Sequence, residues 1–182
     1  MRVFAAVPLD DETRHRLAHL VSDHVVEMPG RAVPPEKWHL TLRFLGELEE
    51  AEVDLIRHAL DDADLGEAFP MAWGRLGAFP RSSRASVLWI GVARGEEPLS
   101  DVAAAVDDAL ESAGFDPEDR PFRPHLTIAR MRPPEDVRPV VRGDPFPDVA
   151  MRIDRVTLYQ SRLGAGGARY EVLDEFELSR KQ

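Results

Sequence analysis

The tetrapeptide His-Leu-Thr-aliphatic occurs twice in this chain, as "HLTL" at residues 39–42 and as "HLTI" at residues 125–128. The chain has only six histidines, so two matched copies call for an explanation. In each copy the histidine and the threonine are two residues apart, and on an extended strand they project from the same face. The sequence therefore predicts two strands, each holding an imidazole and a hydroxyl side by side on a rigid element.

Two imidazoles and two hydroxyls suit an in-line displacement at a phosphodiester. One histidine takes a proton from the attacking water and the other gives a proton to the departing oxygen, since an unperturbed pKa of about 6.5 allows either task near neutral pH. The hydroxyls of Thr41 and Thr127 would donate to the non-bridging oxygens, where charge accumulates. A five-membered 2′,3′-cyclic phosphate fits this chemistry because its leaving oxygen stays tethered and only water is added.

Arginines near the two motifs are candidate substrate ligands. Strict alternation places Arg43 on the same face as His39, so we expect it to contact phosphate or RNA, and it places Phe44 in the core. Arg130 has the opposite parity to His125. It should point away from that histidine unless the strand ends or bulges before it.

The composition is that of an ordinary globular protein, with 43% hydrophobic and 31% charged residues. The length of 182 residues predicts one domain with two lobes over residues 1–182. No apolar run has the length that a membrane span needs, and the apolar start is too short for a signal peptide. The absence of cysteine excludes disulfides and thiolate catalysis, and it suits a reducing cytoplasm, where we expect the protein.

The net charge of −10 argues against a protein that coats long nucleic acids. Such proteins need a basic stripe to neutralise phosphates, and this chain has only two lysines, Lys37 and Lys181. If the substrate is a polyanion, we expect a few placed arginines to bind a small part of it. We expect a monomer.

The elements that must position the motifs alternate between strands and helices, and strands dominate. We expect the α+β class with a mostly antiparallel sheet arrangement. A helix is predicted over residues 12–26, with Asp10 or Asp11 as its N-cap and an apolar face of Leu17, Leu20 and Val21. Further helices are predicted over residues 49–63 and between an N-cap at Ser100 and a terminating Gly114. Further strands are predicted over residues 2–7, 38–45, 69–79, 86–93, 149–160 and 169–178, the last two forming a hairpin around "GAGG", and residues 132–147 are predicted to be loop with one helical turn.

Segments well beyond the two motifs carry a resemblance to a known family. With "VPPEKWHLTLRFLGE", "GFDPEDRPFRPHLTIAR" and "VTLYQSRLGAGGARYEVL", the chain resembles the two-histidine phosphoesterase superfamily. More narrowly, it is similar to the bacterial and archaeal RNA 2′,3′-cyclic phosphodiesterases, also called 2′-5′ RNA ligases. The resemblance covers nearly the whole chain.

This resemblance implies a bilobal fold. Two pseudo-symmetric antiparallel sheets would face each other across a central cleft, with helices on the outside. It also implies hydrolysis of RNA ends bearing 2′,3′-cyclic phosphate, or of small cyclic nucleotides, to 2′-phosphomonoesters without metal or cofactor. His39 would protonate the leaving 3′-oxygen, His125 would activate water, and an arginine at position 130 would bind substrate.

Other functions fit part of the same pattern. The site could run in reverse and join a cyclic phosphate to a 5′-hydroxyl, or it could act on a cyclic phosphate of a small metabolite. A non-catalytic module that binds RNA ends or a phosphorylated metabolite is the alternative from another class. A metal-dependent phosphodiesterase is disfavoured because no carboxylate lies beside either motif, and His15 with His19 lacks the glutamate of the zincin pattern.

Overall fold

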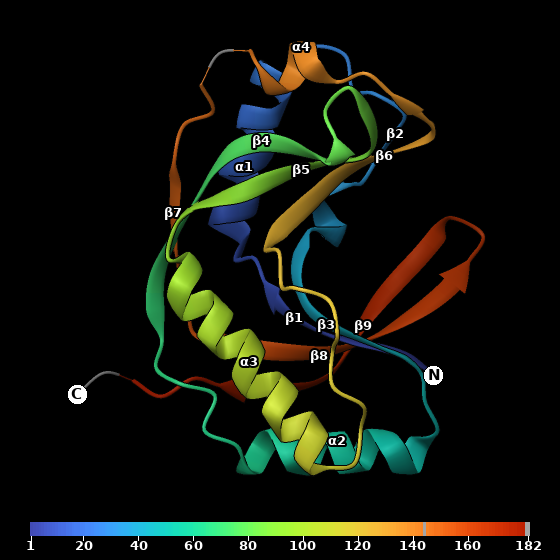
Figure 1. Cartoon of the computed structure of the whole chain (residues 1–182), viewed down its shortest axis with the longest axis vertical. Coiled ribbons are helices and arrows are strands. Elements are labelled where there is room, and N and C mark those ends of the chain that lie inside the picture. Colours follow the sequence, from blue (N-terminus) through green and yellow to red (C-terminus); the bar gives the residue numbers. More distant parts are fainter. Residues whose placement is uncertain (144, 181–182) are drawn as a thin grey trace.

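The computed structural model describes residues 1–143 and 145–180, and its strands form two antiparallel sheets, one in the upper and one in the lower half of the molecule in Figure 1. The first sheet has the order β3-β1-β8-β9, from β1 (Arg2–Pro8), β3 (His39–Glu47), β8 (Arg155–Gly164) and β9 (Gly167–Glu177). The second has the order β2-β6-β5-β4-β7, from β2 (Arg31–Ala32), β4 (Phe69–Arg81), β5 (Arg84–Arg94), β6 (His125–Glu135) and β7 (Val149–Ile153). The expected α+β class is confirmed.

The two sheets repeat one pattern. The order β3-β1-β8-β9 matches the order β6-β5-β4-β7, and β2 is added beyond β6. Each series begins with a motif strand, and every pairing between named strands in the described part of the chain is antiparallel. The two motifs therefore occupy equivalent positions in two similar sheets, as the family resemblance implied.

The strand predicted over residues 149–160 is in fact two strands that belong to different sheets. Ile153 at the end of β7 pairs with Phe69, whereas Val156 in β8 pairs with Phe176. The chain crosses from one sheet to the other at Asp154, which lies between the two strands. The parity of burial changes at the crossing, because Val149, Met151 and Ile153 are buried before it and Val156 and Leu158 are buried after it. This change marks a break between two strands, but it does not tell which sheet the second strand joins.

Two long helices each cover a sheet other than the one that they follow in the chain. Helix α1 (Asp11–His24) follows β1 of the first sheet but packs against β7 of the second. Helix α3 (Glu96–Ser112) follows β5 of the second sheet but packs against β3 of the first, beside α2 (Glu50–Asp62), which also contacts β9. This exchange ties the two halves together (Figure 1).

The ends of the helices follow local capping chemistry. Asp10 accepts a hydrogen bond from the Thr13 backbone N–H at 2.7 Å and begins α1, as predicted. The prediction that Ser100 begins α3 is wrong, because that helix starts at Glu96, directly after Gly95 at φ 87°. Gly114 follows its end at φ 95°, which favours glycine. Leu99, Val102, Ala103, Val106 and Leu110 are its buried face.

Two short helical segments complete the chain. The 3₁₀ helix η1 (Pro35–Lys37) leads into the first motif strand. The segment predicted as loop over 132–147 begins instead as strand, since β6 continues to Glu135, and it then forms α4 (Arg138–Val141). Within the described ranges, the helices are all too short or too polar to cross a membrane.

Candidate active site

Each motif strand contains a one-residue bulge at the same place. In β3, Thr41 pairs with Ala6 but Arg43 pairs with Ala5, so one extra residue is inserted. In β6, Thr127 pairs with Trp89 but Ala129 pairs with Leu88. Before the bulge the alternation is as predicted, because each histidine and threonine is half-buried while the leucine between them is buried. After it, the two faces are exchanged.

The bulge removes Arg43 from the face that carries His39. The prediction that the two side chains share a face is wrong. Arg43 is only 8% exposed and lies on the core side, where Nη1 donates to Asp107 Oδ1 of α3 at 2.8 Å. Its Nη2 donates to the backbone carbonyl of Asp116, in the loop that leads to the second motif. Arg43 therefore joins one motif strand to the loop that enters the other.

The same bulges bring Phe44 and Arg130 onto the face that carries the histidines. Phe44 was expected in the core, yet it is 60% exposed, and its ring centroid lies 6.0 Å from that of Phe4. Arg130 is also exposed, and its parity was expected to turn it away. Its charge instead acts on both His39 and His125, so it lies near the two imidazoles.

Both imidazoles are held by the same contact. His39 Nδ1 lies 2.8 Å from the Lys37 carbonyl oxygen, and His125 Nδ1 lies 2.6 Å from the Arg123 carbonyl oxygen. A carbonyl only accepts, so each Nδ1 carries a hydrogen and donates it. Within the described residues neither Nε2 has a hydrogen-bond partner, and in the neutral ring that atom holds the free lone pair. Each ring is thus oriented to exchange a proton through Nε2.

The two loops that precede the motifs supply those carbonyls. Ahead of β3, the Trp38 indole donates to the Val33 carbonyl at 2.9 Å, and the Trp38 backbone N–H closes η1 on Pro35. Trp38 is buried, so it packs rather than offering a stacking surface. The prolines at 34, 35, 121 and 124 restrict the backbone before each histidine.

Aromatic rings surround His39. Its centroid lies 4.8 Å from Phe4, 5.1 Å from Tyr170 in an edge-on arrangement, and 6.2 Å from Tyr159. Burial lowers the pKa of His39 below its ordinary value, and the charges of Arg130 and His125 lower it further, while the hydrogen bond to the Lys37 carbonyl opposes them. Tyr170 lies on β9, far from the motif in sequence, and no local signal in the sequence pointed to it.

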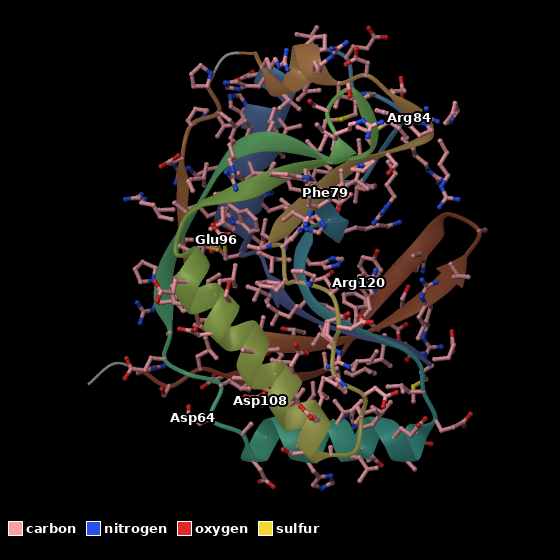
Figure 2. All side chains as sticks on the ribbon, in the orientation of Figure 1. Asp64, Phe79, Arg84, Glu96, Asp108 and Arg120 are labelled. Atoms are coloured by element: carbon pink, nitrogen blue, oxygen red, sulfur yellow. The ribbon has the colours of Figure 1, made fainter. Side chains whose placement is uncertain are left out.

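Fewer aromatic rings lie close to His125 than to His39 among the described residues. Phe79 of β4 meets its ring edge-on at 4.9 Å, and Figure 2 labels this residue in the upper half of the molecule. Burial lowers the pKa of His125, the hydrogen bond to the Arg123 carbonyl opposes this effect, and the charge of Arg130 adds to it. Both histidines therefore give up a proton more readily than an imidazole in water.

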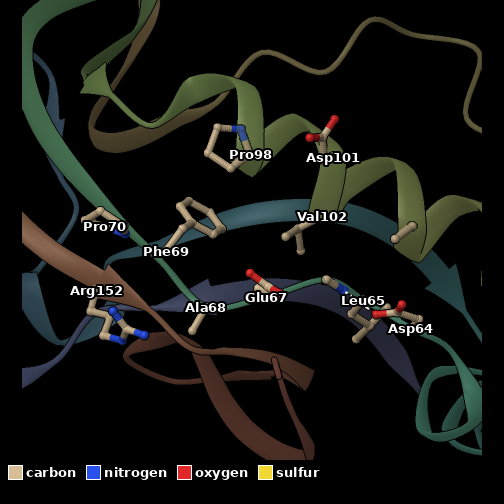
Figure 3. Close-up of a pocket in the computed structure, with 12 residues that line it drawn as sticks. Asp64, Leu65, Glu67, Ala68, Phe69, Pro70, Pro98, Asp101, Val102 and Arg152 are labelled. Carbon is tan, nitrogen blue, oxygen red and sulfur yellow. Dashed lines mark hydrogen bonds between the residues drawn. The ribbon is translucent and has the colours of Figure 1, made fainter. Parts of the chain in front are cut away.

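Two further arginines and one hollow have no contact with either histidine among the described residues. Arg84 is exposed beside the β4–β5 turn, and Arg162 pairs with Glu171 at 2.9 Å in the last hairpin. A hollow of about 560 Å³ lies between α3 and the 64–70 segment, with Arg152 at its rim (Figure 3). Neither histidine lines it, so the chemistry is assigned by the paired motifs and not by this hollow.

Comparison with known proteins places this geometry in a family. The model of the 2′-5′ RNA ligase superfamily matches residues 10–165. The chain belongs to this superfamily. It is 34% identical to an RNA 2′,3′-cyclic phosphodiesterase of Archaeoglobus fulgidus over 97% of this chain and all of the relative, and 35% identical to one of Thermus thermophilus over 98% and 90%.

Solved structures agree with the superfamily assignment. The crystal structure of E. coli LigT in apo form is similar to this chain with a TM-score of 0.81 and 27% sequence identity, covering 98% of this chain and 97% of LigT. The fold of this chain therefore matches that of LigT over nearly its whole length.

Proposed function

We propose that this chain hydrolyses the 2′,3′-cyclic phosphate of RNA ends or nucleotides to a 2′-phosphomonoester, as a two-lobed domain over residues 1–182. The observation that carries the proposal is the matched pair of imidazoles, each held through Nδ1 with Nε2 free and both within reach of the charge of Arg130. Curated relatives at about one-third identity are named RNA 2′,3′-cyclic phosphodiesterase, which supports the same activity.

The reaction needs one acid and one base. We assign the acid to His39, whose protonated Nε2 gives its hydrogen to the departing 3′-oxygen. The base is His125, whose Nε2 takes a proton from the attacking water. The phosphorus–O3′ bond breaks as the phosphorus–water oxygen bond forms, and the phosphate stays on the 2′-oxygen. The tether of the ring keeps the leaving oxygen in place.

The negative charge that develops on the phosphate oxygens in the transition state needs hydrogen-bond donors. Thr41 and Thr127 stand on the same faces as the histidines, so their hydroxyls suit the non-bridging oxygens. The Arg130 guanidinium offers two parallel N–H donors, which match a phosphate better than a point charge does. Arg43 does not bind the phosphate in this proposal, because its guanidinium already donates to Asp107 and to the Asp116 carbonyl.

Cations without carboxylate partners gather near the histidines. Arg31 is the ladder partner of Arg130, and Lys37 precedes the first motif. None of these three cations has a carboxylate within 4.0 Å among the described residues, although the chain carries a net charge of −10. An anionic substrate would relieve this local excess of positive charge.

We expect the nucleoside of the substrate to bind on the lobe formed by the first sheet, which carries His39. Phe44 presents an exposed ring beside Phe4, on the face that carries His39. Bases stack on such rings without strong sequence preference. E. coli LigT has been crystallised with 3′-AMP and with phosphate, which supports a nucleotide as a ligand of this chain.

Product identity tests the proposal. The purified protein is incubated with adenosine 2′,3′-cyclic phosphate in excess chelator, and the products are separated by chromatography that resolves the 2′- from the 3′-monophosphate. We expect the 2′-monophosphate alone. Formation of the 3′ isomer would contradict the assignment of the leaving oxygen, and binding without turnover would favour the non-catalytic module.

A further inference from the structure

A second cluster of an arginine and an aromatic ring lies beside His125, on the second lobe. Gly91 of β5 is the ladder partner of His125, and Trp89 is the partner of Thr127. Side chains of directly paired residues project from the same face of a sheet. The indole of Trp89 therefore lies on the face that carries His125, alongside the hydroxyl of Thr127.

Two glycines leave room for the indole. A Cβ atom added to Gly77, the ladder partner of Trp89 on β4, would come within 2.2 Å of the ring. A Cβ added to Gly91 would come within 2.8 Å of it. The ring lies against the sheet, and its N–H finds no acceptor among the described residues. The other two tryptophans, Trp38 and Trp73, are buried in the core.

Arg75 completes the cluster. It is the extra residue of a bulge in β4, and at φ 57° it is the one residue other than glycine in the described chain with a positive φ. Its Nε would lie 3.0 Å from a Cβ at Gly91, next to His125, and its guanidinium carbon lies 5.9 Å from the centre of the Trp89 ring. Its side chain is exposed and has no carboxylate partner among the described residues.

The positive φ of Arg75 indicates that its side chain has a function. Glycine would adopt this conformation without strain, so an arginine here is costly for the fold. Strained positions persist where the side chain serves a site. A guanidinium over an indole provides a cation and a flat apolar face together, a combination that suits the phosphate and the base of a nucleotide.

We propose that Arg75 and Trp89 form a second nucleoside subsite, which holds the residue bearing the 5′-oxygen that attacks or leaves on the His125 side. The inference rests on the proposed function. In an in-line displacement the entering and leaving oxygens lie on opposite sides of phosphorus. His39 serves the 3′-oxygen beside Phe44, so the group that replaces water must approach from the side of His125, where this cluster lies.

The step balances without a further reactant. In the joining direction, the 5′-hydroxyl oxygen bonds to phosphorus and its proton passes to Nε2 of His125. The phosphorus–O3′ bond breaks, and His39 gives its proton to O3′. The product is a 2′-5′ phosphodiester with a free 3′-hydroxyl, and the reverse steps cleave that linkage to the cyclic phosphate.

The test compares two ligands on one set of variants. Hydrolysis of adenosine 2′,3′-cyclic phosphate is measured with adenylyl-(2′→5′)-adenosine as a competing ligand. For Arg75→Gly we expect the inhibition constant of the dinucleotide to rise roughly tenfold or more, as for a lost charge-assisted contact. The kcat and KM for the cyclic mononucleotide should stay within about twofold of wild type, since that substrate lacks the second nucleoside.

Glycine at position 75 also relieves the positive φ, so the variant should unfold at an unchanged or higher temperature. Loss of dinucleotide binding without loss of stability separates recognition from a structural role. The matched control is Arg152→Ala, an exposed arginine on β7 of the same sheet that lines the hollow in Figure 3. It should change neither constant.

Fluorescence gives a second readout, because Trp89 is the one tryptophan outside the core. The dinucleotide should alter the indole emission of the wild type more than that of Trp89→Phe. A wild type that the dinucleotide does not inhibit, an Arg75→Gly variant that loses both ligands equally, or binding that leaves the emission unchanged would each overturn the subsite. If the cyclic mononucleotide itself is not hydrolysed, the proposed function fails instead.

Discussion

Phe44 and Arg130 occupy equivalent positions in the two halves of this protein. Each follows its motif histidine by five residues, and each is turned onto the histidine-bearing face by a one-residue bulge in its strand. One half thus offers an aromatic ring and the other a guanidinium. The approximate symmetry of the fold supplies two similar positions. We propose that the difference between these two residues gives them different partners, a base for Phe44 and a phosphate for Arg130.

Phe44→Ala should weaken the use of cyclic nucleotides without unfolding the protein. The ring is 60% exposed, so its removal creates no core cavity. Loss of base stacking is worth about 1–3 kcal/mol, which lowers kcat/KM for adenosine 2′,3′-cyclic phosphate by roughly 5- to 150-fold. Steady-state kinetics measures this. Phe44→Tyr should retain most activity, and Leu55→Ala, which removes an exposed apolar side chain from α2, should change nothing.

Sequence alternation correctly predicted which way the first four residues of each motif strand face. From His39 to Leu42 and from His125 to Ile128 the half-buried and buried residues alternate as predicted, because a strand with one buried face imposes period two. The wrong assignments of Arg43 and Phe44 both come after the bulge. A bulge depends on the register of the neighbouring strand, which a local pattern does not contain.

In the fold as well, features that depend on neighbouring residues were predicted, and features that depend on contacts between distant segments were not. The helix that begins at Asp10 was predicted from its cap and its apolar spacing, which are local. The crossing at Asp154 and the contact between Tyr170 and His39 depend on which sheet a strand joins. Those choices are made by the packing of distant segments, so no pattern in a short window of the sequence reveals them.

Arg43→Ala should destabilise the fold more than it impairs catalysis. It leaves Asp107 and the Asp116 carbonyl without their buried partner, and breaking such a pair costs about 3 kcal/mol. We expect a fall in Tm of roughly 6–12 °C for a chain of this size. Below the transition, kcat/KM for the cyclic nucleotide should stay within about threefold of wild type, since this arginine does not reach the substrate.

The control for this prediction is Arg57→Ala on α2. Arg57 makes longer and more exposed ion pairs, at 3.8 Å to Asp54 and 4.0 Å to Asp174, and such pairs contribute less than about 1 kcal/mol. Its melting temperature should fall much less. If Arg43→Ala lost most of its kcat/KM while its melting temperature stayed at the wild-type value, the result would show that Arg43 acts on the substrate and not on the fold.

His39→Ala and His125→Ala should each abolish most hydrolysis. Removing one proton-transfer group costs about 10²- to 10⁴-fold in kcat. The double variant should lose little more than either single one, because acid and base act in one step. Single-turnover hydrolysis of the cyclic nucleotide measures the loss, and circular dichroism confirms folding. His58→Ala, on the exposed face of α2, is the matched control, and a folded single variant with near wild-type kcat would remove its histidine from the mechanism.

The pH dependence of kcat/KM should report both imidazoles and the charge beside them. Under the proposed roles, the active free enzyme has His39 protonated and His125 neutral. An essential base and an essential acid give kcat/KM a bell-shaped dependence on pH. Since burial and Arg130 lower the pKa of both rings below about 6.5, both limbs of this profile should have their midpoints below about pH 6.5. A neighbouring positive charge disfavours protonation. Arg130→Gln therefore raises both pKa values, and both limbs should move to higher pH.

This shift separates an electrostatic effect from a loss of phosphate binding, because a lost contact lowers kcat/KM without moving the limbs. Arg130→Lys keeps the charge, so its limbs should stay near those of wild type even though its activity falls with the loss of the planar pair of donors. Arg84→Gln, which removes an exposed charge at the β4–β5 turn, should leave the profile unchanged. Limbs that remain at their wild-type positions in Arg130→Gln would show that this guanidinium does not set the proton affinity of the histidines.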